Sequence, residues 1–276
     1  MKIKAPAKVN LALDIVGQDD RGYHLLDMIM APINIYDELA VTYYDKDVVV
    51  CQSMEIPEVN TMSRMLSLLK RTFHIESCFK VEVIKRIPME AGLAGGSADA
   101  AALMVAILEM EHISISLDEK ISLAKQIGAD VPFCLVNQWA RVQGIGEVIR
   151  PIETNWKLKA LLVKPNVGIS TPKAFKNWHE QAPLKVNVSN VEKSIVHQDY
   201  ASLFEMMDNT LEPIAKRMEP VLEEIHDKMI KNGIQRVLMS GSGSSMIGFC
   251  VDEDRLIQTK KKLEKEYPFV EIITIG

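Results

Sequence analysis

Pro88-Met-Glu-Ala-Gly-Leu-Ala-Gly-Gly-Ser-Ala-Asp-Ala-Ala-Ala102 is a glycine-bearing loop that continues, without a helix breaker, into an alanine-rich segment. Gly92, Gly95 and Gly96 let the backbone adopt conformations that are closed to other residues and let a ligand approach it closely. Ser97 is placed at the start of a helix, with an aspartate in its first turn. Because the first amides of a helix lack partners, we expect an anion here, and phosphate is the obvious one. The alternative is an ordinary strand-to-helix turn.

The composition limits what kind of protein this is. A chain of 276 residues can form one large or two ordinary domains, and a formal net charge of −5 gives no support to a nucleic-acid surface. The four cysteines and six histidines are scattered without metal-ligand spacing, so we predict no metal site built from protein ligands. No apolar run has the length of a membrane span or signal peptide, so we expect a cytoplasmic protein.

The order of the predicted elements indicates an α+β fold. Alternating apolar positions predict strands near residues 3–15, 28–35, 39–43, 48–51 and 79–83, and helices are expected at 60–74, 97–111 and 117–127. A hairpin follows at 139–152. A second series of elements begins near residue 158, with helices at 191–197, 203–216 and 220–232. We therefore predict two domains, residues 1–154 and 155–276.

Polar residues at three places near apolar segments are candidates for chemistry. Asp130 follows Gly128 and precedes Pro132, so it is expected in a tight connection, either as a turn former or as a carboxylate with a partner at the edge of the core. Lys8 and Asn10 share one face of the first strand, and a solvated outer face is the default interpretation for them. Tyr23-His24 after a turn is weak evidence by itself.

The common nucleotide motifs are absent from the sequence. It lacks the Walker Gly-x-x-x-x-Gly-Lys-Ser/Thr pattern, the His-Arg-Asp and Asp-Phe-Gly motifs of protein kinases, and the hydrolase Gly-x-Ser-x-Gly elbow. The sequence still contains four features that suit a nucleotide site: the glycine loop, a second Ser/Gly loop at residues 240–245, Lys8 and Asp130. Phosphoryl transfer needs backbone donors around the nucleotide, a cation, and a group that handles the proton of the nucleophile.

Several separated segments together resemble the GHMP small-molecule kinases, and the resemblance spans nearly the whole chain. The segments are Ala5-Pro-Ala-Lys-Val-Asn-Leu11, Gly22-Tyr-His24, Asp37-Glu-Leu39, the opening stretch, Gly128-Ala-Asp-Val-Pro-Phe133, Gly144-Ile-Gly-Glu147, Lys164-Pro-Asn-Val-Gly-Ile-Ser-Thr171 and Met239-Ser-Gly-Ser-Gly243. The resemblance implies an N-terminal, ribosomal-protein-like α/β domain and a C-terminal ferredoxin-like α+β domain, with the active site in the cleft between them.

The resemblance also implies roles for individual residues. Asp130 matches the catalytic aspartate, and Lys8 matches the lysine paired with it. The residues that match ATP-binding positions are Asn60, near the adenine, and Pro88, Met89, Glu90, Ala91, Gly92, Leu93, Ala94, Gly95, Gly96, Ser97 and Ala98 around the phosphates. The residues that match substrate-binding positions are Asn10, Tyr23, His24, Phe175, Gly241 and Gly243, with Phe175 and Tyr23 stacking around a cytosine.

The implied reaction is transfer of the γ-phosphate of ATP, with Mg²⁺, to the 2-hydroxyl of a methylerythritol linked to cytidine diphosphate, a step of non-mevalonate isoprenoid synthesis. Asp130 acts as the base in a direct, in-line transfer. The alternatives are a homoserine- or mevalonate-type kinase, or a non-catalytic nucleotide or metabolite sensor. The expected partner is a small molecule, not a nucleic acid or membrane, and the protein is expected to be a monomer or homodimer. Asn137-Gln-Trp139 and Ser244-Ser245 depart from the family pattern, and Trp139 is interpreted as core filling or as a determinant of substrate fit.

Overall fold

The computed structural model of the chain describes residues 1–51, 53–178 and 185–276. It folds into two compact units that alternate along the sequence. Unit 1 comprises Met1–Ala7, Ile35–Ile87 and Ala94–Asn137, and unit 2 comprises Lys8–Asn34, Pro88–Leu93 and Gln138–Gly276. The alternation arises because the long strands β1 (Lys2–Gln18) and β2 (His24–Tyr44) each contribute to both units. The domain division between residues 154 and 155 remains a prediction.

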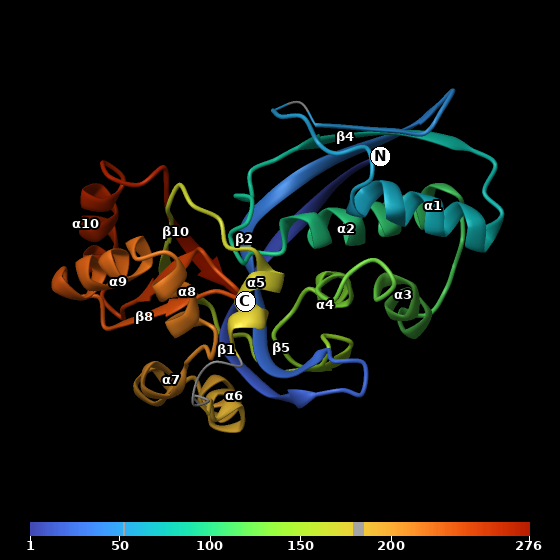
Figure 1. Ribbon diagram of the computed structural model, residues 1–276. Coiled ribbons are helices and arrows are strands. Elements are labelled where there is room, and N and C mark those ends of the chain that lie inside the picture. The colour runs from blue at the N-terminus through green and yellow to red at the C-terminus, as the bar shows by residue number, and fades with distance from the viewer. Residues whose placement is uncertain (52, 179–184) are drawn as a thin grey trace. The chain divides into compact units, whose positions relative to one another are not determined.

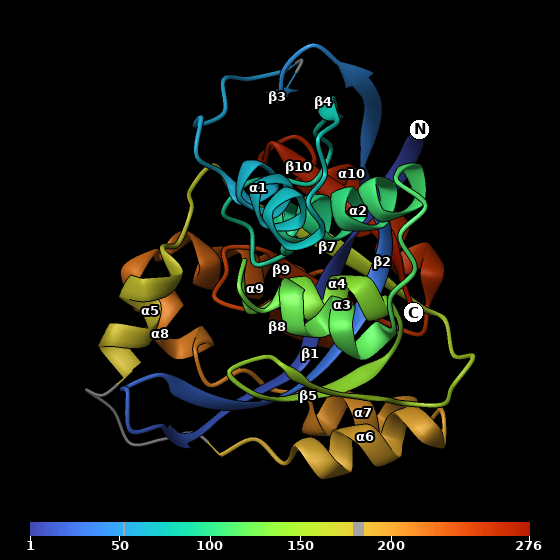
Figure 2. The same ribbon diagram turned by 90° about the vertical axis from the view of Figure 1, so that its right-hand side faces the viewer.

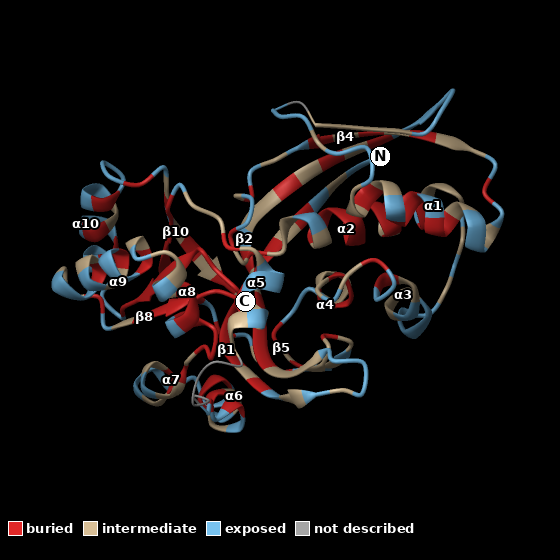
Figure 3. Cartoon of the chain, in the orientation of Figure 1, coloured by how far each residue is buried: buried red, intermediate tan, exposed pale blue. Residues whose placement is uncertain are grey.

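Unit 1 is a sheet covered on one face by helices. Strand β4 (Cys78–Ile84) pairs in parallel with β3 (Val48–Cys51) and antiparallel with the second half of β2, where Glu38 faces Ile84 and Tyr44 faces Cys78. Helices α1 (Thr61–Phe73) and α2 (Gly95–Met110) lie side by side below this sheet (Figures 1 and 2). The middle of α2, from residue 98 to residue 108, is buried except at Val105 (Figure 3), as its alanine and other apolar side chains require.

The prediction of two strands at residues 28–35 and 39–43 was wrong, because β2 is continuous. Asp37 lies between the two predicted strands, but its carboxylate is buried in the sheet and accepts hydrogen bonds from the backbone amides of Arg86 and Ile87 at 2.5 and 2.8 Å. A buried charge with such partners is compatible with a strand interior.

The helix ends in unit 1 follow the capping residues, with two corrections. Asn60 forms a capping box on α1, and Ser116 forms one on α3 (Leu117–Ala124), where the sequence predicts helices. Helix α2 begins at Gly95 and not at Ser97, after Ala94 in a left-handed conformation. The expected tight connection at Asp130 is the start of a short helix, α4 (Val131–Val136), because proline is well suited to the first turn of a helix.

Unit 2 contains an antiparallel sheet of ferredoxin-like topology. Strands β7 (Leu158–Lys164), β8 (Arg236–Met239), β9 (Met246–Phe249) and β10 (Phe269–Ile275) lie in the order β10-β7-β9-β8. All three pairings are antiparallel. Helix α9 (Val221–Lys231) packs on β8 and β9, and helix α10 (Glu253–Leu263) packs on β7 and β10 (Figure 1). This βαββαβ arrangement confirms the ferredoxin-like prediction.

The remaining elements of unit 2 surround that sheet. Strands β5 (Ala140–Gly144) and β6 (Val148–Pro151) form the predicted hairpin, and β5 pairs with the first half of β2. The further helices are α5 (Thr171–Trp178), α6 (Val188–Val196), α7 (Tyr200–Met206) and α8 (Glu212–Met218). The single helix predicted at 203–216 is thus two helices. Across the described ranges, no helix has the length and hydrophobicity that crossing a bilayer requires.

Trp139 lies in the core of unit 2. Its side chain is buried, and its indole N–H donates a hydrogen bond to the carbonyl oxygen of Trp156 at 3.2 Å. An added Cβ on Gly276 would lie 2.1 Å from the same indole nitrogen, so the tryptophan packs tightly against the chain end. These contacts favour the interpretation as core filling.

Candidate active site

In unit 2, two loops are joined by backbone hydrogen bonds. They are the first half of the glycine loop, Pro88–Leu93, and the Ser/Gly loop at residues 240–245. The amides of Ser244 and Ser245 donate to the carbonyl oxygens of Glu90 and Ala91 at 3.3 and 3.2 Å. Gly92 has a φ of +72°, and a Cβ there would lie 2.0 Å from the carbonyl oxygen of Ser240. Because backbone atoms cannot give way at that distance, this approach of the two loops requires glycine at position 92.

Lys8 is held at the junction of these loops. Its ammonium donates to Asn10 Oδ1 at 2.8 Å and to the carbonyl oxygen of Gly92 at 3.2 Å. Lys8 is 4% exposed and Asn10 is 1% exposed, so their expected solvated outer face was wrong. Burial of an ammonium is costly unless oxygen atoms surround it, and the glycine loop supplies one of them.

The second Ser/Gly loop completes this cluster. A Cβ added to Gly241 would lie 3.3 Å from Lys8 Nζ and 3.4 Å from Asn10 Oδ1, so the glycine backbone packs directly against both side chains. Ser240 Oγ donates to the carbonyl oxygen of Gly92 at 3.0 Å. The structure therefore brings together Lys8, Asn10, Gly92 and Gly241, four residues predicted to belong to the site.

A buried asparagine that the sequence analysis missed supports the same loop. Asn209 is 1% exposed, and its Nδ2 donates to the carbonyl oxygens of Met239 and Gly241, both at 2.8 Å. Its Oδ1 accepts a hydrogen bond from the amide of Leu211 at 2.9 Å, in the connection between α7 and α8. An asparagine between two helical segments is a common break, so the sequence carried no signal of this contact.

In unit 1, the second half of the glycine loop begins α2. Ala94 has a φ of +57°, and no side chain caps the helix. Thr61 Oγ1 donates to the carbonyl oxygen of Gly96 at 2.7 Å, which fixes the first turn of α2 to the start of α1. The amides of Ser97 and Ala98 donate to the carbonyl oxygen of Ala94 at 3.0 and 2.9 Å, and the earlier amides of such an uncapped helix start can bind phosphate oxygens.

The segment that carries Asp130 lies beside this helix start. Helix α4 packs on α2, and a Cβ on Gly128 would lie 3.9 Å from Ser97 Oγ. Asp130 is half-buried and occupies the N-cap position of α4, but its carboxylate does not cap that helix. Unit 1 therefore places the predicted base beside the predicted phosphate loop.

The Asn60 side chain, which was predicted to lie near the adenine of ATP, caps helix α1 in unit 1. Its Oδ1 accepts from the amides of Met62 and Ser63, at 2.9 and 3.0 Å, and its Nδ2 donates to the carbonyl oxygen of Pro57 at 2.8 Å. The adjacent Val59 lines a cavity of about 310 Å³. The remaining residues that line it are Ser63, Arg64, Ser67, Leu68, Arg71, Gln126 and Ile127. A contact of Asn60 with adenine stays a prediction.

Aromatic side chains gather near the predicted substrate residues of unit 2. The rings of His24 and Phe175 lie 5.0 Å apart and are tilted by 34°, and Trp178 meets His24 edge-on at 5.5 Å. Tyr23 is 57% exposed, with the guanidinium of Arg21 5.2 Å from its ring. The structure thus pairs Phe175 with His24, and the stacking of Phe175 and Tyr23 around a base stays a prediction.

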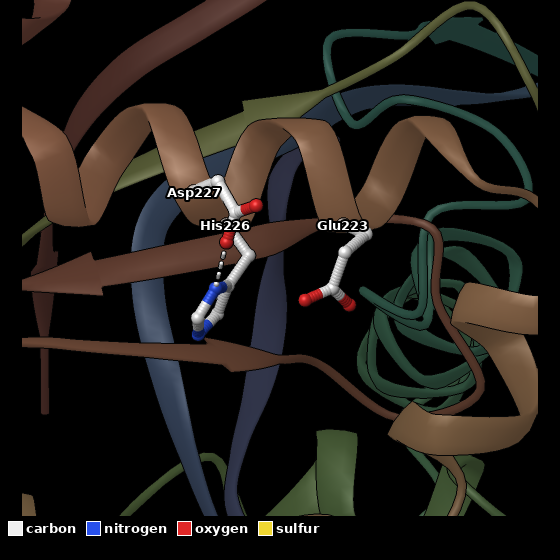
Figure 4. Close-up of side chains that lie close together, drawn as sticks. All are labelled: Glu223, His226 and Asp227. Carbon is white, nitrogen blue, oxygen red and sulfur yellow. Dashed lines mark hydrogen bonds and ion pairs between the residues drawn. The ribbon is translucent and has the colours of Figure 1, made fainter.

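A group of possible metal ligands lies elsewhere, on α9. Glu223, His226 and Asp227 project from the same helix, and His226 Nδ1 is 3.2 Å from Asp227 Oδ1 (Figure 4). Both carboxylates are exposed, and Glu223 forms an ion pair with Lys216 at 3.1 Å. These contacts are those of a solvated helix surface. None of the three is a residue predicted for the site.

The two clusters belong to different units. Lys8, Asn10, Gly92 and Gly241 are in unit 2, together with Tyr23, His24, Phe175 and Gly243. Asp130, Asn60 and residues 94–98 are in unit 1. The pairing of Lys8 with Asp130 is therefore still a prediction.

The chain is similar to known proteins along nearly its whole length. Residues 60–138 match the model of the GHMP kinases N terminal domain, and residues 191–268 match that of the GHMP kinases C terminal domain. A 4-diphosphocytidyl-2-C-methyl-D-erythritol kinase of Thermoanaerobacter sp. (strain X514) is 35% identical over 274 residues, 98% of this chain and 94% of that protein. A protein of Streptococcus mutans serotype c that carries this name provisionally is 36% identical over 95% of this chain and 96% of its own length.

Solved structures agree with this similarity. A crystal structure of 4-(cytidine 5′-diphospho)-2C-methyl-D-erythritol kinase has a TM-score of 0.83 and 29% identity, and the match covers 100% of this chain and 99% of that one. The homoserine kinase of Cytophaga hutchinsonii, at 18% identity and a TM-score of 0.77 over 100% and 94% of the two chains, shares the fold. The chain belongs to the GHMP kinase family, whose members are ATP-dependent kinases of small molecules.

Proposed function

We propose that the protein phosphorylates the 2-hydroxyl of 4-diphosphocytidyl-2-C-methyl-D-erythritol, with ATP as the phosphate donor. The observation that carries this proposal is the similarity at about 35% identity over nearly the full length to proteins with that name. The Lys8, Asn10, Gly92 and Gly241 cluster and the uncapped start of α2 support it, because they supply a buried cation and phosphate-binding amides.

In the proposed reaction, Asp130 accepts the proton of the attacking hydroxyl. Lys8 is proposed to act on the same hydroxyl, which makes the oxygen a better nucleophile. The bond from this oxygen to the γ-phosphorus forms as the bond to the β-phosphate oxygen breaks, and ADP leaves. No phosphoenzyme is formed.

Magnesium is proposed as the metal that accompanies ATP. Mg²⁺ would bind mainly through phosphate oxygens of ATP and water beside the start of α2. The bound ion neutralises charge on the transferred phosphate. The group at Glu223, His226 and Asp227 is not assigned to it.

The aromatic residues favour a cytidine-bearing substrate over a small alcohol. Phe175, His24 and the exposed Tyr23 provide ring faces on which a pyrimidine can stack, whereas homoserine and mevalonate have no ring to place there. We therefore rank homoserine- and mevalonate-type kinases second. A non-catalytic sensor ranks third, because the buried Lys8 cluster has the features of a charged group retained for chemistry.

The test is ADP release with a panel of acceptors under identical conditions. We expect turnover with 4-diphosphocytidyl-2-C-methyl-D-erythritol and background rates with homoserine and mevalonate. If only another alcohol supports turnover, the proposed substrate is wrong and that alcohol is the substrate. Binding of ATP without turnover on any acceptor would favour the sensor.

A further inference from the structure

A lysine and two aspartates form a buried ion cluster in unit 1. Lys85, which follows the end of β4, donates to Asp37 Oδ2 in β2 and to Asp99 Oδ2 in α2, the latter at 2.7 Å. Asp37 is 0% and Asp99 1% exposed. Three separate segments, β2, the end of β4 and α2, are thus tied together by a single ammonium group. No role was assigned to this cluster from the sequence.

The two carboxylates of the cluster differ in their surroundings. The second oxygen of Asp37 accepts from two backbone amides, whereas Asp99 Oδ1 is buried without a partner. Burial raises the pKa of Asp99 to about 7 against the lowering effect of Lys85, and the charge of Asp37 raises it further. A buried carboxylate with one unpaired oxygen destabilises a fold, so its presence requires a compensating advantage.

The cluster lies directly against the start of α2. A Cβ on Gly95 would be 3.3 Å from Lys85 Nζ and 3.1 Å from Ile87 Cγ2, so the ammonium packs on the first residue of the helix. Asp99 is four residues further along the same helix. The first turn of α2 therefore contacts both the Lys85–Asp99 ion pair and the Thr61 hydroxyl, which donates to the carbonyl oxygen of Gly96. In the absence of a side-chain cap, these contacts hold its amides in place.

We propose that Asp99 and Lys85 are positioning residues for the ATP-phosphate loop: their ion pair fixes the first turn of α2 so that its amides point at the phosphates. This inference rests on the proposed ATP-binding function. It assigns to Asp99 no contact with ATP and no part in proton transfer. Its effect falls on nucleotide affinity, because pre-ordered donors lose less entropy when the ligand binds.

The test compares two variants of the full-length protein with the wild type. Asp99→Asn keeps the shape and an acceptor oxygen for Lys85 but loses the charge, and Asp99→Leu loses both. Asp118→Asn, at an exposed acidic residue of α3, is the matched control. ATP affinity is measured by calorimetry without the second substrate, and hydrogen exchange of residues 94–98 is measured without any ligand.

We expect the dissociation constant of ATP to rise about threefold in Asp99→Asn and about tenfold in Asp99→Leu, with kcat at saturating ATP within twofold of the wild type. The tenfold change is the loss expected for a hydrogen-bonded charge pair. Exchange at residues 94–98 accelerates in the same order, and the control is unchanged. Rescue of most of the affinity by asparagine distinguishes positioning from simple destabilisation.

Unchanged ATP affinity and unchanged exchange in Asp99→Asn would overturn the inference, and this result suffices if Asp99→Leu does not fold. A fall in kcat with unchanged ATP affinity would also overturn it. A wild-type protein that does not bind ATP at all would instead overturn the proposed function, since that measurement involves no variant.

Discussion

The carboxylate of Asp99 allows a prediction of how stability depends on pH. Its pKa is raised from 3.8 to about 7 in the folded protein, first by burial, against the lowering effect of Lys85. The folded protein therefore holds this proton more tightly than the unfolded chain. The resulting stability is fully present below pH 4 and is lost as the pH rises through about 7. The Asp99→Asn variant is neutral at every pH and does not show this loss.

The two pKa values give the size of the effect. One pKa unit corresponds to about 1.4 kcal/mol, so the full loss is of the order of 4 kcal/mol, of which about 2–3 kcal/mol falls between pH 5 and pH 8. Relative to the wild type, the free energy of unfolding of Asp99→Asn should rise by that amount over this interval. Urea unfolding of both proteins at pH 5, 6, 7 and 8, without nucleotide, measures it.

Asp118→Asn, exposed on α3, is the control and should show a nearly constant difference from the wild type. A constant difference for Asp99→Asn as well would refute the reasoning, since it would mean that Asp99 does not change protonation in this range. A difference that falls with rising pH would show that Lys85 outweighs burial. Together with weaker ATP binding, a gain in stability at pH 8 would show that the buried charge trades stability for function.

Four further changes test other parts of the account. Asp130→Asn should lower kcat by about 10²–10⁴ and leave ATP binding nearly intact, as expected for loss of a general base; wild-type turnover would contradict that role. Gly92→Ala should destabilise unit 2 by at least about 2 kcal/mol in urea unfolding, because its Cβ would lie 2.0 Å from the Ser240 carbonyl oxygen and φ is +72°; wild-type stability would mean that the loops can separate freely. Ala94→Gly should raise the free energy of unfolding by up to about 1 kcal/mol by relieving a φ of +57°, and a loss would contradict the strain. Phe175→Ala should raise the KM for the cytidyl substrate about tenfold and leave the KM for ATP unchanged; equal effects on both would argue against stacking.

The parts of the fold that could be predicted from the sequence are those set by local rules. The helix that starts at Ser116 and the hairpin around Gly144 depend on residues a few positions apart, and the structure has both. The start of α2 was misplaced because Ala94 adopts a left-handed conformation that alanine disfavours. The segment before Pro132 was predicted as a tight connection, although the proline stands in the first turn of α4.

The contacts of the site depend on distant segments, and the sequence could identify residue types but not partners. Lys8 has the pattern of a solvated strand face, and its burial follows from Gly92, which is 84 positions away. Asp99 could be interpreted as a favourable charge near a helix start, whereas its partner is Lys85 at the end of a strand. Asn209 gave no signal, because asparagine at a helix break is common.

The most direct test of the central claim is the identity of the product. The protein is incubated with ATP, magnesium and 4-diphosphocytidyl-2-C-methyl-D-erythritol, and the reaction is followed by phosphorus-31 NMR. We expect one new phosphomonoester signal without proton coupling, because the 2-carbon of the methylerythritol bears no hydrogen. We also expect an equal amount of ADP and an intact cytidine diphosphate linkage. ADP without a new phosphomonoester, or a phosphomonoester on another hydroxyl, would contradict the proposed function.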